Sequence, residues 1–503
     1  MNFKRIFSLL LAVMMLSSCF LFGCDGTAKD TQQGTVGGFD PGDTADTSKI
    51  YDAPIRDLGG HEFLFSVKKT SSIQTASHEF YAEDLNGEKI NDAVFTRNSQ
   101  LMEKYNCVIK ENQMKDPAAN LKDPLLAGDY VCDYIYDATR NFPNLAVSNL
   151  LVDLSVLENI NLKKAWYDQS TMPKINMGGK SFYVQGDGII GDDKSAWIVY
   201  FNKELVSAFD SDLNLYQKVR EGEWTLELMY QIMEGTKNDL NGDGAFTIGS
   251  DRFGLIAERA TNWMFVNACN VTVSVIADDG SYTLPDSPKP ELIDAWTALK
   301  PVLTSPYREV SSKIANYKNA MGTFYAGNAG ILFEMGDVTF DYGVLPMPKL
   351  NKDQANYCTG VMASQFNSIV IPSTVNSANN DWAKNGFSSG AEQAAYFLEA
   401  YFYYSMNVLT PAFYDQVVLK QSIVDEDSRE MIIIALEHKV FDFICTMNFG
   451  GMNLFATVGS ENKNNIVGTD ALYDTLVSEY ESRVGAARTE FQAYLDGVAA
   501  SGQ

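Results

Sequence analysis

Strand-like and helix-like segments alternate through the first part of this chain. Residues 61–67, "HEFLFSV", predict a strand, residues 90–106 have the apolar spacing of a helix, and residues 107–111 and 130–138 predict two further strands. This alternation is typical of an α/β layer with parallel strand pairing. No internal repeat of about 20 to 50 residues is present, which weakens the case for a solenoid or a propeller.

The later segments continue the mixed pattern. Residues 223–238 predict a helix in which Thr225 is the N-cap. Further strands are expected at the start of residues 194–209 and over 329–335, 342–350 and 367–372, and further helices over 391–406 and 428–444. The sequence therefore predicts an α/β protein with a mainly helical C-terminal part.

The first 24 residues have the organisation of a secretory signal. Lys4 and Arg5 give a short positive start, and an almost wholly apolar run over residues 6–15 follows. This run is too short, and wrongly flanked, for a lasting membrane span. It is followed by Cys19 and Cys24, each preceded by small residues, and both sites resemble the lipobox of bacterial lipoproteins. We favour lipidation at Cys24, where the polar segment begins. Cys19 is one alternative, and an ordinary signal peptide with incidental cysteines is another.

A polar segment over residues 25–50 follows the signal, with few large apolar side chains. Such a segment cannot bury enough surface to fold by itself, so we expect a flexible tether. A flexible chain of this length has a root-mean-square reach of about 25–30 Å. Acyl chains bury about 0.8 kcal/mol per methylene, so a lipidated Cys24 would hold the body just outside the outer face of a membrane.

Size and charge limit the class of protein. About 450 residues follow the tether, too many for one ordinary core, so two domains are expected. The formal net charge of −25 argues against a nucleic-acid partner and against a polybasic contact with anionic lipid. Acidity of this kind is most simply a solubility feature. No second stretch of the sequence has the length and apolar character of a membrane span.

Cysteine usage gives no sign of a disulfide framework. Five cysteines remain after those of the signal: Cys107, Cys132, Cys269, Cys358 and Cys445. Their number is odd, they are widely scattered, and none forms a CxxC pair, so a zinc site is not expected either. We interpret them as mostly buried thiols, with a single bridge left open.

The order of motifs between about residues 55 and 450 resembles a known family. The matching stretches are "NDAVFTRNSQLMEKYNCVIK", "LVDLSVLENINLKKAWYDQS", "GGKSFYVQGD", "WIVYFNKELV", "EWTLELMYQIMEGTKNDLNGDG", "FGLIA", "YGVLPMPKLN" and "IVIPSTV". The chain is similar to bacterial extracellular solute-binding proteins of the family-1 type, the lipoprotein receptors of carbohydrate ABC importers. The resemblance implies an α/β fold of the periplasmic-binding-protein type II, with two α/β lobes joined by hinge crossings and a solute held between them.

The resemblance also implies the lobe boundaries, the ligand and the partners of the chain. Beyond the signal (1–24) and the tether (25–50), the first lobe is expected over residues 51–193 and 356–405, and the second over 194–355 and 406–503. The expected ligand is a carbohydrate, above all an oligosaccharide, and the expected partners are the transmembrane subunits of an ABC permease and the membrane through the lipid anchor. We expect a monomer on the extracellular face of the cell membrane that needs no cofactor and catalyses nothing.

A first group of candidate ligand residues follows the predicted strand that ends near residue 138. Asp137, Thr139, Arg140 and Asn141 come at the edge where open α/β sheets bind ligands. Carboxylates, amides and guanidinium groups can bond the hydroxyl rim of a sugar. The alternative for these four residues is a solvated loop.

The resemblance points to further candidates at the expected crossings and strand ends. Trp197 lies where the first crossing would fall, and hinge packing is the alternative for it. Trp263 follows the "FGL" strand. A position facing the cleft is one interpretation, and a position facing away from it is the alternative. Glu334 and Asp337 occupy a loop in which relatives often place ligand contacts, with plain surface carboxylates as the alternative.

The last candidates precede or follow later elements. Phe366 and Asn367 precede the strand "SIVIP" at another expected crossing, and Asn448 and Phe449 lie in "MNFGGM". Aromatic rings could stack on the apolar faces of a sugar. Trp166 and Trp224, by contrast, are interpreted as structural.

Residues 239–251, "DLNGDGAFTIGSD", resemble a calcium-binding loop. Oxygen ligands at alternating positions, followed by a glycine for the sharp turn, match the pattern that wraps a hard cation. The usual last ligand position holds Ser250, and Asp251 comes one residue late. A structural calcium ion would be held by Asp239, Asn241, Asp243, Ala245 and Asp251. The alternative is an Asn/Asp/Gly turn without an ion.

Two other classes of protein are alternatives to a receptor. A secreted glycan-active enzyme needs two carboxylates that flank one bond, and 64 acidic residues always offer candidates. The three histidines form no HExxH motif, and no GxSxG motif is present. A calcium-dependent adhesion or scaffold lipoprotein would typically carry two calcium loops close together, whereas this sequence shows one.

Overall fold

The structure of this chain is a computed structural model. It describes residues 47–69, 79–176, 178–258, 261–277, 281–311, 314–361, 363–377, 381–419, 425–456 and 469–501. The predicted signal, Cys19, Cys24 and almost all of the predicted tether lie outside these ranges. Residues from Ser48 onward form one unit, and the elements described below belong to it.

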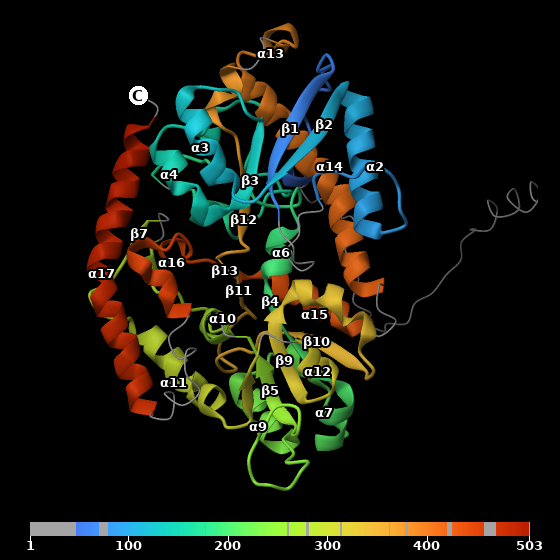
Figure 1. The fold of residues 1–503 in the computed structure, drawn as a ribbon, viewed down its shortest axis with the longest axis vertical. Helices are drawn as coiled ribbons and strands as arrows, with labels where there is room; N and C mark the ends of the chain where they lie inside the picture. The colour runs from blue at the N-terminus through green and yellow to red at the C-terminus, as the bar shows by residue number, and fades with distance from the viewer. Residues whose placement is uncertain are drawn as a thin grey trace, which may run out of the picture. The chain divides into compact units, whose positions relative to one another are not determined.

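Four strands form the first sheet, in the order β12-β3-β1-β2 (Figure 1). They are β1 (His61–Lys68), β2 (Cys107–Met114), β3 (Tyr134–Ala138) and β12 (Asn367–Val370). β1 pairs in parallel with both β2 and β3, as the alternating sequence pattern predicts. β12 comes from much later in the chain and runs antiparallel to β3.

Three helices accompany the first sheet: α2 (Lys89–Tyr105), α3 (Pro117–Ala127) and α14 (Gly390–Leu419). α14 packs against α2 and contributes a ladder of aromatic side chains to the core. The ring of Phe63 in β1 stacks on that of Phe397 in α14, with 3.9 Å between the centroids. Such pairs stabilise the core beyond the area they bury, so α14 is fixed to β1 although over 300 residues separate them.

Five strands form the second sheet, in the order β10-β4-β9-β5-β8. They are β4 (Trp197–Asn202), β5 (Phe253–Ala257), β8 (Arg308–Val310), β9 (Gly322–Asn328) and β10 (Tyr342–Pro346). β5 pairs in parallel with β8 and β9, whereas β4 runs antiparallel to β9 and β10. β4 thus lies inside the sheet, between β10 and β9, and runs against the direction of the other four strands.

Seven described helices surround the second sheet. They are α7 (Lys203–Phe209), α8 (Leu215–Arg220), α9 (Leu226–Thr236), α10 (Thr261–Ala268), α11 (Pro290–Thr304), α12 (Ile314–Lys318) and α15 (Glu426–Glu437). Thr225 is the N-cap of α9, as predicted, and its side chain accepts a hydrogen bond from the Leu228 N–H. The fully buried Trp224 donates its Nε1–H to the Pro346 carbonyl at 2.8 Å, which confirms a structural role.

The chain passes between the two sheets at α6 (Gly191–Ser195), which leads into β4, and at β11 (Thr359–Gly360), which precedes β12. β13 (Lys439–Val440) pairs in parallel with β11. The hydroxyl of Thr359 accepts a hydrogen bond from the Trp197 N–H at 2.9 Å and donates one to the Trp197 carbonyl at 2.6 Å. These crossing segments are therefore hydrogen-bonded to one another.

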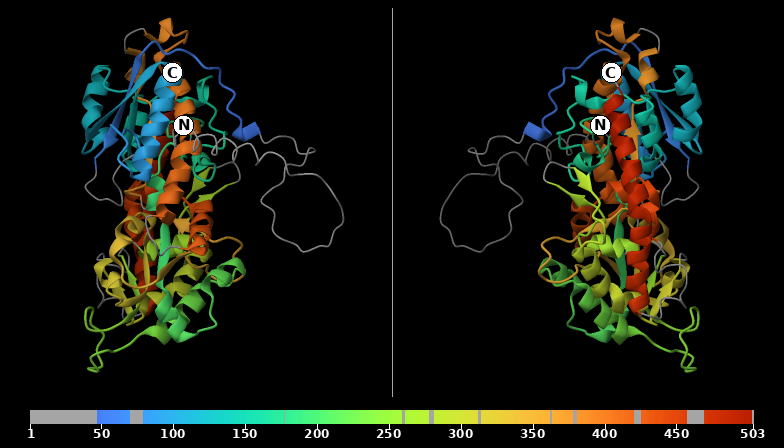
Figure 2. Two further views of the ribbon diagram at one scale, coloured as in Figure 1. Left: turned by 90° about the vertical axis from the view of Figure 1, so that its right-hand side faces the viewer. Right: turned by 90° about the vertical axis from the view of Figure 1, so that its left-hand side faces the viewer.

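The C-terminal part contains α16 (Phe443–Thr446), the 3₁₀ helix η6 (Phe449–Ala456) and the long helix α17 (Thr469–Ala500). α17 runs along the side of the unit, drawn in red in Figures 1 and 2. The hydroxyl groups of Tyr494 and Tyr183 lie 3.2 Å apart, which links α17 to a segment packed on the first sheet. The helix also contacts α11 beside the second sheet.

The remaining described elements are short. They are η1 (Thr47–Lys49), η2 (Thr139–Asn141), α4 (Pro143–Val147), η3 (Leu154–Val156), α5 (Met172–Ile175), β6 (Val275–Ile276), β7 (Tyr282–Thr283), η4 (Ala329–Asp337), η5 (Ser373–Ser377) and α13 (Asp381–Lys384).

Two sequence predictions differ from the structure. Residues 329–335 form the 3₁₀ helix η4 and not a strand, because β9 has just supplied the strand and short apolar runs fit either element. The predicted helix over 428–444 ends at Glu437, and the chain bends at His438 before it enters β13. This break matters, because it places Lys439 at the crossings.

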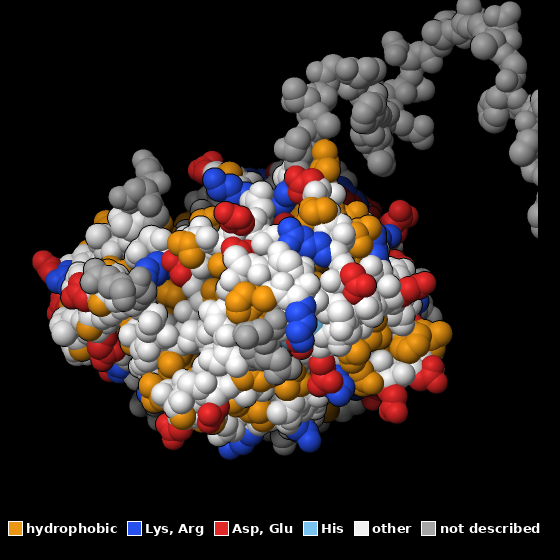
Figure 3. Space-filling view, turned by 90° about the horizontal axis from the view of Figure 1, so that it is seen from above, with side chains coloured by type: hydrophobic (Ala, Val, Ile, Leu, Met, Phe, Trp, Pro, Cys, Tyr) orange, Lys and Arg blue, Asp and Glu red, His pale blue; other side chains and the backbone are white. Residues whose placement is uncertain are grey.

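The five described cysteines are free and buried, as expected for core thiols. Burial raises the pKa of the Cys107 and Cys269 thiols to about 12, so they are poor nucleophiles. Over the described part of the chain, no helix combines the length and the apolar character that a membrane span needs. The face shown in Figure 3 carries acidic and basic side chains that are interspersed and form no continuous basic surface.

Candidate ligand site

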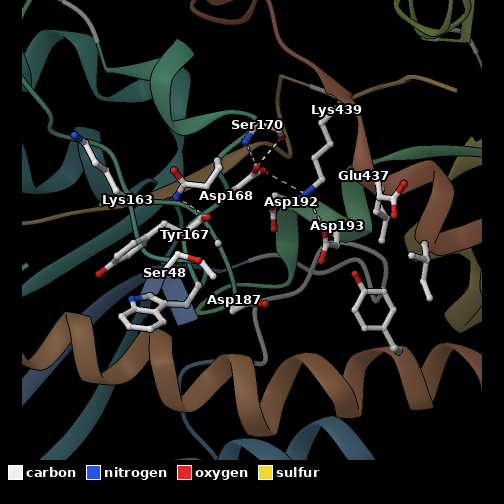
Figure 4. Close-up of a pocket in the computed structure, with 17 residues that line it drawn as sticks. Ser48, Lys163, Tyr167, Asp168, Ser170, Asp187, Asp192, Asp193, Glu437 and Lys439 are labelled. Carbon is white, nitrogen blue, oxygen red and sulfur yellow. Dashed lines mark hydrogen bonds and ion pairs between the residues drawn. The ribbon is translucent and has the colours of Figure 1, made fainter. Parts of the chain in front are cut away.

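A cavity of about 480 Å³ lies beside the crossings, within the size range of small-molecule sites (Figure 4). We call it the Lys439 cavity. Its charged lining is acidic in excess, and three aromatic residues also belong to the lining. The carboxylates are Asp168, Asp187, Asp192, Asp193 and Glu437, the amines are Lys163 and Lys439, and the aromatic residues are Trp166, Tyr167 and Tyr414.

Lys439 is the centre of a buried ion cluster in this cavity. Its Nζ lies 2.6 Å from Asp193, 2.9 Å from Asp192 and 3.7 Å from Asp168. Burial by itself would lower the pKa of Lys439, but the three carboxylates outweigh it and raise this pKa well above its ordinary value. Because Lys439 belongs to β13 and two of the acids belong to α6, the cluster connects two crossing segments (Figure 4).

The loop that carries Asp168 is built by local hydrogen bonds. The carboxylate accepts bonds from the backbone N–H and the hydroxyl of Ser170, at 2.8 and 2.6 Å. Burial opposes ionisation of Asp168, but Lys439 and these bonds lower its pKa overall. One carboxylate oxygen of the buried Asp192 has no hydrogen-bond partner among the described residues, so the cavity retains an acceptor that a ligand could use.

Asp187 and Asp192 differ from Asp168 in their ionisation. Burial raises the pKa of each carboxyl to about 7. The hydroxyl of Thr410 in α14 donates a hydrogen bond to Asp187 at 2.7 Å, which partly offsets the effect of burial. The charge of the cavity therefore changes close to neutral pH.

We expect Asp187→Asn to flatten the pH dependence of stability. A carboxyl whose folded pKa is raised stabilises the fold below its unfolded pKa of about 3.9, and this contribution is lost as the pH rises through about 7. Between pH 4 and pH 8, urea denaturation should show the wild type losing about 2–4 kcal/mol more than the variant. The exposed Asp294→Asn is the control, and equal pH profiles for wild type and Asp187→Asn would contradict the raised pKa.

A second cavity of about 390 Å³ adjoins the first, with Ser170 and Lys439 in the lining of both. We call it the Lys174 cavity. Ser170 and Lys174 come from the segment that packs on the first sheet through the pairing of Val184 with Ile369. Asn270, Thr272, Val275, Ile276 and Lys289 come from the α10–α11 region, and Asn356, Cys358 and residues 438–441 come from the crossings. This cavity is thus lined from both sides of the crossings.

The first group of predicted residues lies at the carboxyl end of β3, as the strand prediction requires. Asp137 and Thr139 are fully buried. Asp137 accepts hydrogen bonds from the backbone N–H groups of Ala118 and Ala138, and the Thr139 hydroxyl donates to the Phe366 carbonyl at 3.0 Å. Both groups are therefore committed to internal bonds, and a ligand role for them stays a prediction.

Arg140 and Asn141 are exposed on η2 at the same sheet edge. The Asn141 amide donates to Asp137 at 3.0 Å, so the loop is tied to the strand that it follows. Asn367 is buried at the start of β12, where its amide donates to the Tyr136 hydroxyl at 2.9 Å. The structure thus gathers these predicted residues at one edge, and a ligand role for them stays a prediction.

The predicted aromatic candidates are buried. Trp197, at the start of β4, is fully buried, and its Nε1–H has no hydrogen-bond partner among the described residues. Trp263 lies in α10 and is 7% exposed. The Phe366 ring packs against that of Phe441, with 4.7 Å between the centroids. Phe449 packs against aromatic residues of α17, while Asn448 is exposed with a positive φ of 62°.

Glu334 and Asp337 lie on η4, which packs against α6. Both contact Lys318: its Nζ donates to the Glu334 carbonyl at 2.9 Å and forms an ion pair with Asp337. The pairing with Lys318 lowers the pKa of the exposed Asp337 carboxyl. The two acids are therefore near a crossing, and a ligand role for them stays a prediction.

The predicted calcium loop forms a network of internal hydrogen bonds. Asp239 accepts bonds from the backbone N–H groups of Gly242 and Gly244, and the buried Asp251 accepts bonds from those of Leu240 and Thr247. The amide of Asn241 donates to Asp243 at 2.9 Å, and Ala245 donates its N–H to Asp243 at 2.8 Å. Over the described residues, no group of three or more His, Cys, Asp or Glu side chains is placed to hold a metal ion. Calcium binding by this loop stays a prediction.

Sequence reasoning missed the Lys439 cluster. Lys439 lies more than 240 residues from Asp192 and Asp193, and it was included in a predicted helix. The one available signal was the pair of adjacent acids in "GDDKSAW", directly before the first predicted crossing. Acids in such a position are usually surface residues, so this signal alone would not have identified the site.

No protein-family model matches this chain, and no curated protein sequence matches it. Solved structures match its fold. The ABC substrate-binding protein Lmo0181 from Listeria monocytogenes, in complex with cycloalternan, is 12% identical, and the match covers 85% of this chain and 99% of that one with a TM-score of 0.51. The GacH receptor of Streptomyces glaucescens GLA.O, described unliganded and with acarbose and an acarbose homolog, is 10% identical over 87% of this chain and 99% of its own, with a TM-score of 0.48.

The chain therefore has the periplasmic-binding-protein type II fold, with two α/β lobes joined by crossings. The first lobe is built on the β12-β3-β1-β2 sheet and the second on the β10-β4-β9-β5-β8 sheet. The sequence-based boundaries between the lobes stay a prediction. α14 continues without a break through the predicted boundary at residue 405.

Proposed function

We propose that this chain is the extracellular receptor of a carbohydrate ABC importer. It binds its solute between the two lobes, beside the crossings, and delivers it unaltered to the transmembrane subunits of a permease. The observation that carries the proposal is the fold itself: two α/β lobes meet at hydrogen-bonded crossings, and two polar cavities lie there. The substrate-binding protein Lmo0181 named above, which is similar in fold, is described in complex with cycloalternan.

The mechanism of such a receptor is a shift between two arrangements of its lobes. A solute that contacts both lobes favours the closed arrangement by as much as it binds that arrangement more tightly. Lys439 and the α6 carboxylates lie at the crossings, so they hold the hinge segments together while the lobes move. Beside the crossings, one carboxylate oxygen of Asp192 has no partner among the described residues, which suits the hydroxyl rim of a sugar. The half-buried ring of Tyr414 in the same lining suits an apolar face.

The proposal extends to location. Lipidation at Cys24 and the tether over residues 25–50 would keep the receptor on the outer face of the membrane, next to its permease. Mass spectrometry of the mature protein from membranes of a bacterial host tests this anchor. A diacylglyceryl group on Cys24 supports it, and a soluble protein with an unmodified N-terminus contradicts it.

We expect a cognate oligosaccharide to stabilise the mature protein. At about one hundred times its dissociation constant, a ligand that binds only the folded state adds about 2.7 kcal/mol to the free energy of unfolding. A thermal-shift screen against a glycan library, followed by calorimetry and recovery of the sugar, measures this. Recovery of the sugar intact supports a receptor, recovery of shortened sugar supports the enzyme alternative, and no binding by any glycan contradicts the proposal.

A further inference from the structure

The Lys174 cavity differs in charge from the rest of the molecule. The whole chain has a formal net charge of −25, yet the described residues that line this cavity include no carboxylate. They include Lys174, Lys289, His438 and Lys439. A cavity lined by amines in such an acidic protein indicates a ligand with the opposite charge.

The charges of Lys174 and Lys289 are not used within the protein. Both side chains are half-buried. Lys289 donates hydrogen bonds to the Thr272 hydroxyl and the Ser274 carbonyl, each at 3.1 Å, and these acceptors are neutral. Among the described residues, no carboxylate lies within ion-pair distance of either lysine. Lys439 is different, because Asp168, Asp192 and Asp193 already compensate it.

The free-energy cost of burying these two charged amines supports the same conclusion. Burial lowers the pKa of Lys174 and of Lys289, and the charges of Asp168 and Asp442, respectively, offset this effect only in part. Asp442 itself accepts backbone hydrogen bonds from Val273 and Ser274. A half-buried cation without a counter-charge is unfavourable, so an anion entering the cavity would relieve this cost.

The two lysines come from different lobes. Lys174 lies in α5, in the segment paired with β12 of the first lobe, and Lys289 lies immediately before α11 of the second lobe. An anion bound to both would contact both lobes at once. Such a ligand favours whichever arrangement brings the two amines together, which is the requirement for coupling binding to closure.

We propose that the Lys174 cavity binds an anionic group of the transported saccharide, a carboxylate, sulfate or phosphate, through Lys174 and Lys289. This inference rests on the proposed function, since it names the class of solute as an acidic carbohydrate. The cavity volume of about 390 Å³ is within the range of small-molecule sites, so it accommodates more than an isolated ion. The amides of Asn270 and Asn356 are available for the sugar ring, whereas the hydroxyl groups of Ser170 and Thr272 already donate to Asp168 and to the Ser274 carbonyl.

Calorimetry on the mature chain tests this inference with three kinds of probe: neutral oligosaccharides, oligosaccharides that contain uronic acid or sulfate, and inorganic phosphate or sulfate. We expect an acidic oligosaccharide to bind, and Lys174→Gln and Lys289→Gln each to weaken this binding by about ten-fold or more. Affinity should also fall as the salt concentration rises. Lys69→Gln is the matched control, because it removes the same charge from an exposed position outside both cavities, and it should leave the affinity unchanged.

The outcomes separate the inference from the function on which it rests. Binding of neutral oligosaccharides alone, unaffected by Lys174→Gln and Lys289→Gln, overturns the inference and supports the receptor. Lysine-dependent binding of inorganic phosphate or sulfate without binding of acidic oligosaccharides overturns the assignment to a saccharide. No binding of any saccharide overturns the proposed function. Far-UV circular dichroism of each variant shows whether it folds, and the double variant Lys174→Arg/Lys289→Arg should retain binding if charge is the requirement.

Discussion

Lys439→Met should destabilise this protein by about 3–5 kcal/mol at pH 8. The substitution keeps the length of the side chain but removes the buried cation that Asp168, Asp192 and Asp193 share. Removing one partner of a buried ion cluster leaves the remaining charges uncompensated, and this costs far more than the loss of a surface ion pair. Urea denaturation followed by tryptophan fluorescence measures the free energy of unfolding.

The same variant should recover stability as the pH falls. Without Lys439, burial raises the folded pKa of the three carboxyls above their unfolded value of about 3.9. Groups shifted in this direction stabilise the fold below the unfolded pKa, and that contribution is lost as the pH rises through the folded pKa. The deficit of Lys439→Met relative to the wild type should therefore be smaller near pH 5 than at pH 8.

Lys163→Met, from the exposed lysine of the same cavity, should change stability by less than about 1 kcal/mol. A deficit independent of pH would contradict the ion-cluster account.

Gly186→Ala should lower the free energy of unfolding by a similar amount, because the added methyl group would clash with backbone atoms. Gly186 has a φ of 138°, and a Cβ atom there would lie 2.2 Å from the Trp166 carbonyl oxygen and 2.9 Å from the Asp168 nitrogen. Backbone atoms cannot move away without disturbing the loop that carries Asp168 and Asp187. We expect a loss of more than about 3 kcal/mol, or failure to fold, because strained backbone and overpacking both oppose the variant. Soluble yield and urea denaturation measure the result.

Gly179→Ala is the matched control for this clash. Gly179 also has a positive φ, of 75°, but a Cβ atom there would meet no other atom within 4 Å. Its cost should be limited to the backbone strain of about 1–2 kcal/mol. Equal stability of the two variants would show that Gly186 does not make the close approach that the structure describes.

The parts of the fold that follow local patterns could be predicted from the sequence. The alternation in "HEFLFSV" places Phe63, Phe65 and Val67 in the core, and the strand and helix order that follows predicts parallel pairing. Thr225 was predicted as the N-cap of a helix, and this is confirmed. These features depend on side chains a few residues apart, so the sequence contains the relevant information locally.

The site could be predicted only in part, because its side chains meet through long-range packing. Asp137 and Thr139 are expected at the end of one strand and Asn367 at a separate crossing, whereas the structure brings them to one sheet edge, where Asn367 pairs with Ala138. The sequence did not show that Asp137 and Thr139 are committed to internal hydrogen bonds, nor that Lys439 meets Asp168, Asp192 and Asp193. Residues 428–444 fit a helix by composition, and only the pairing of Lys439 and Val440 with β11 breaks that pattern.

The opposite charges of the two cavities at the crossings could not be seen in the composition. Lys174 and Lys289 are separated by more than a hundred residues, and an overall charge of −25 gives no indication of a local positive site. The chain is acidic overall, whereas this cavity holds amines without a counter-charge. The cavity therefore differs in charge from its surroundings, which would favour an anionic ligand. Under the proposed function, the specificity of the chain for its solute would depend on where charge is left unpaired.

Small-angle scattering of the mature protein, with and without a saturating oligosaccharide that calorimetry shows to bind, tests most directly that the two lobes close on a solute. We predict a smaller radius of gyration with the oligosaccharide, and a return to the starting value once it is removed by dialysis. An unchanged scattering curve at full occupancy would contradict the account.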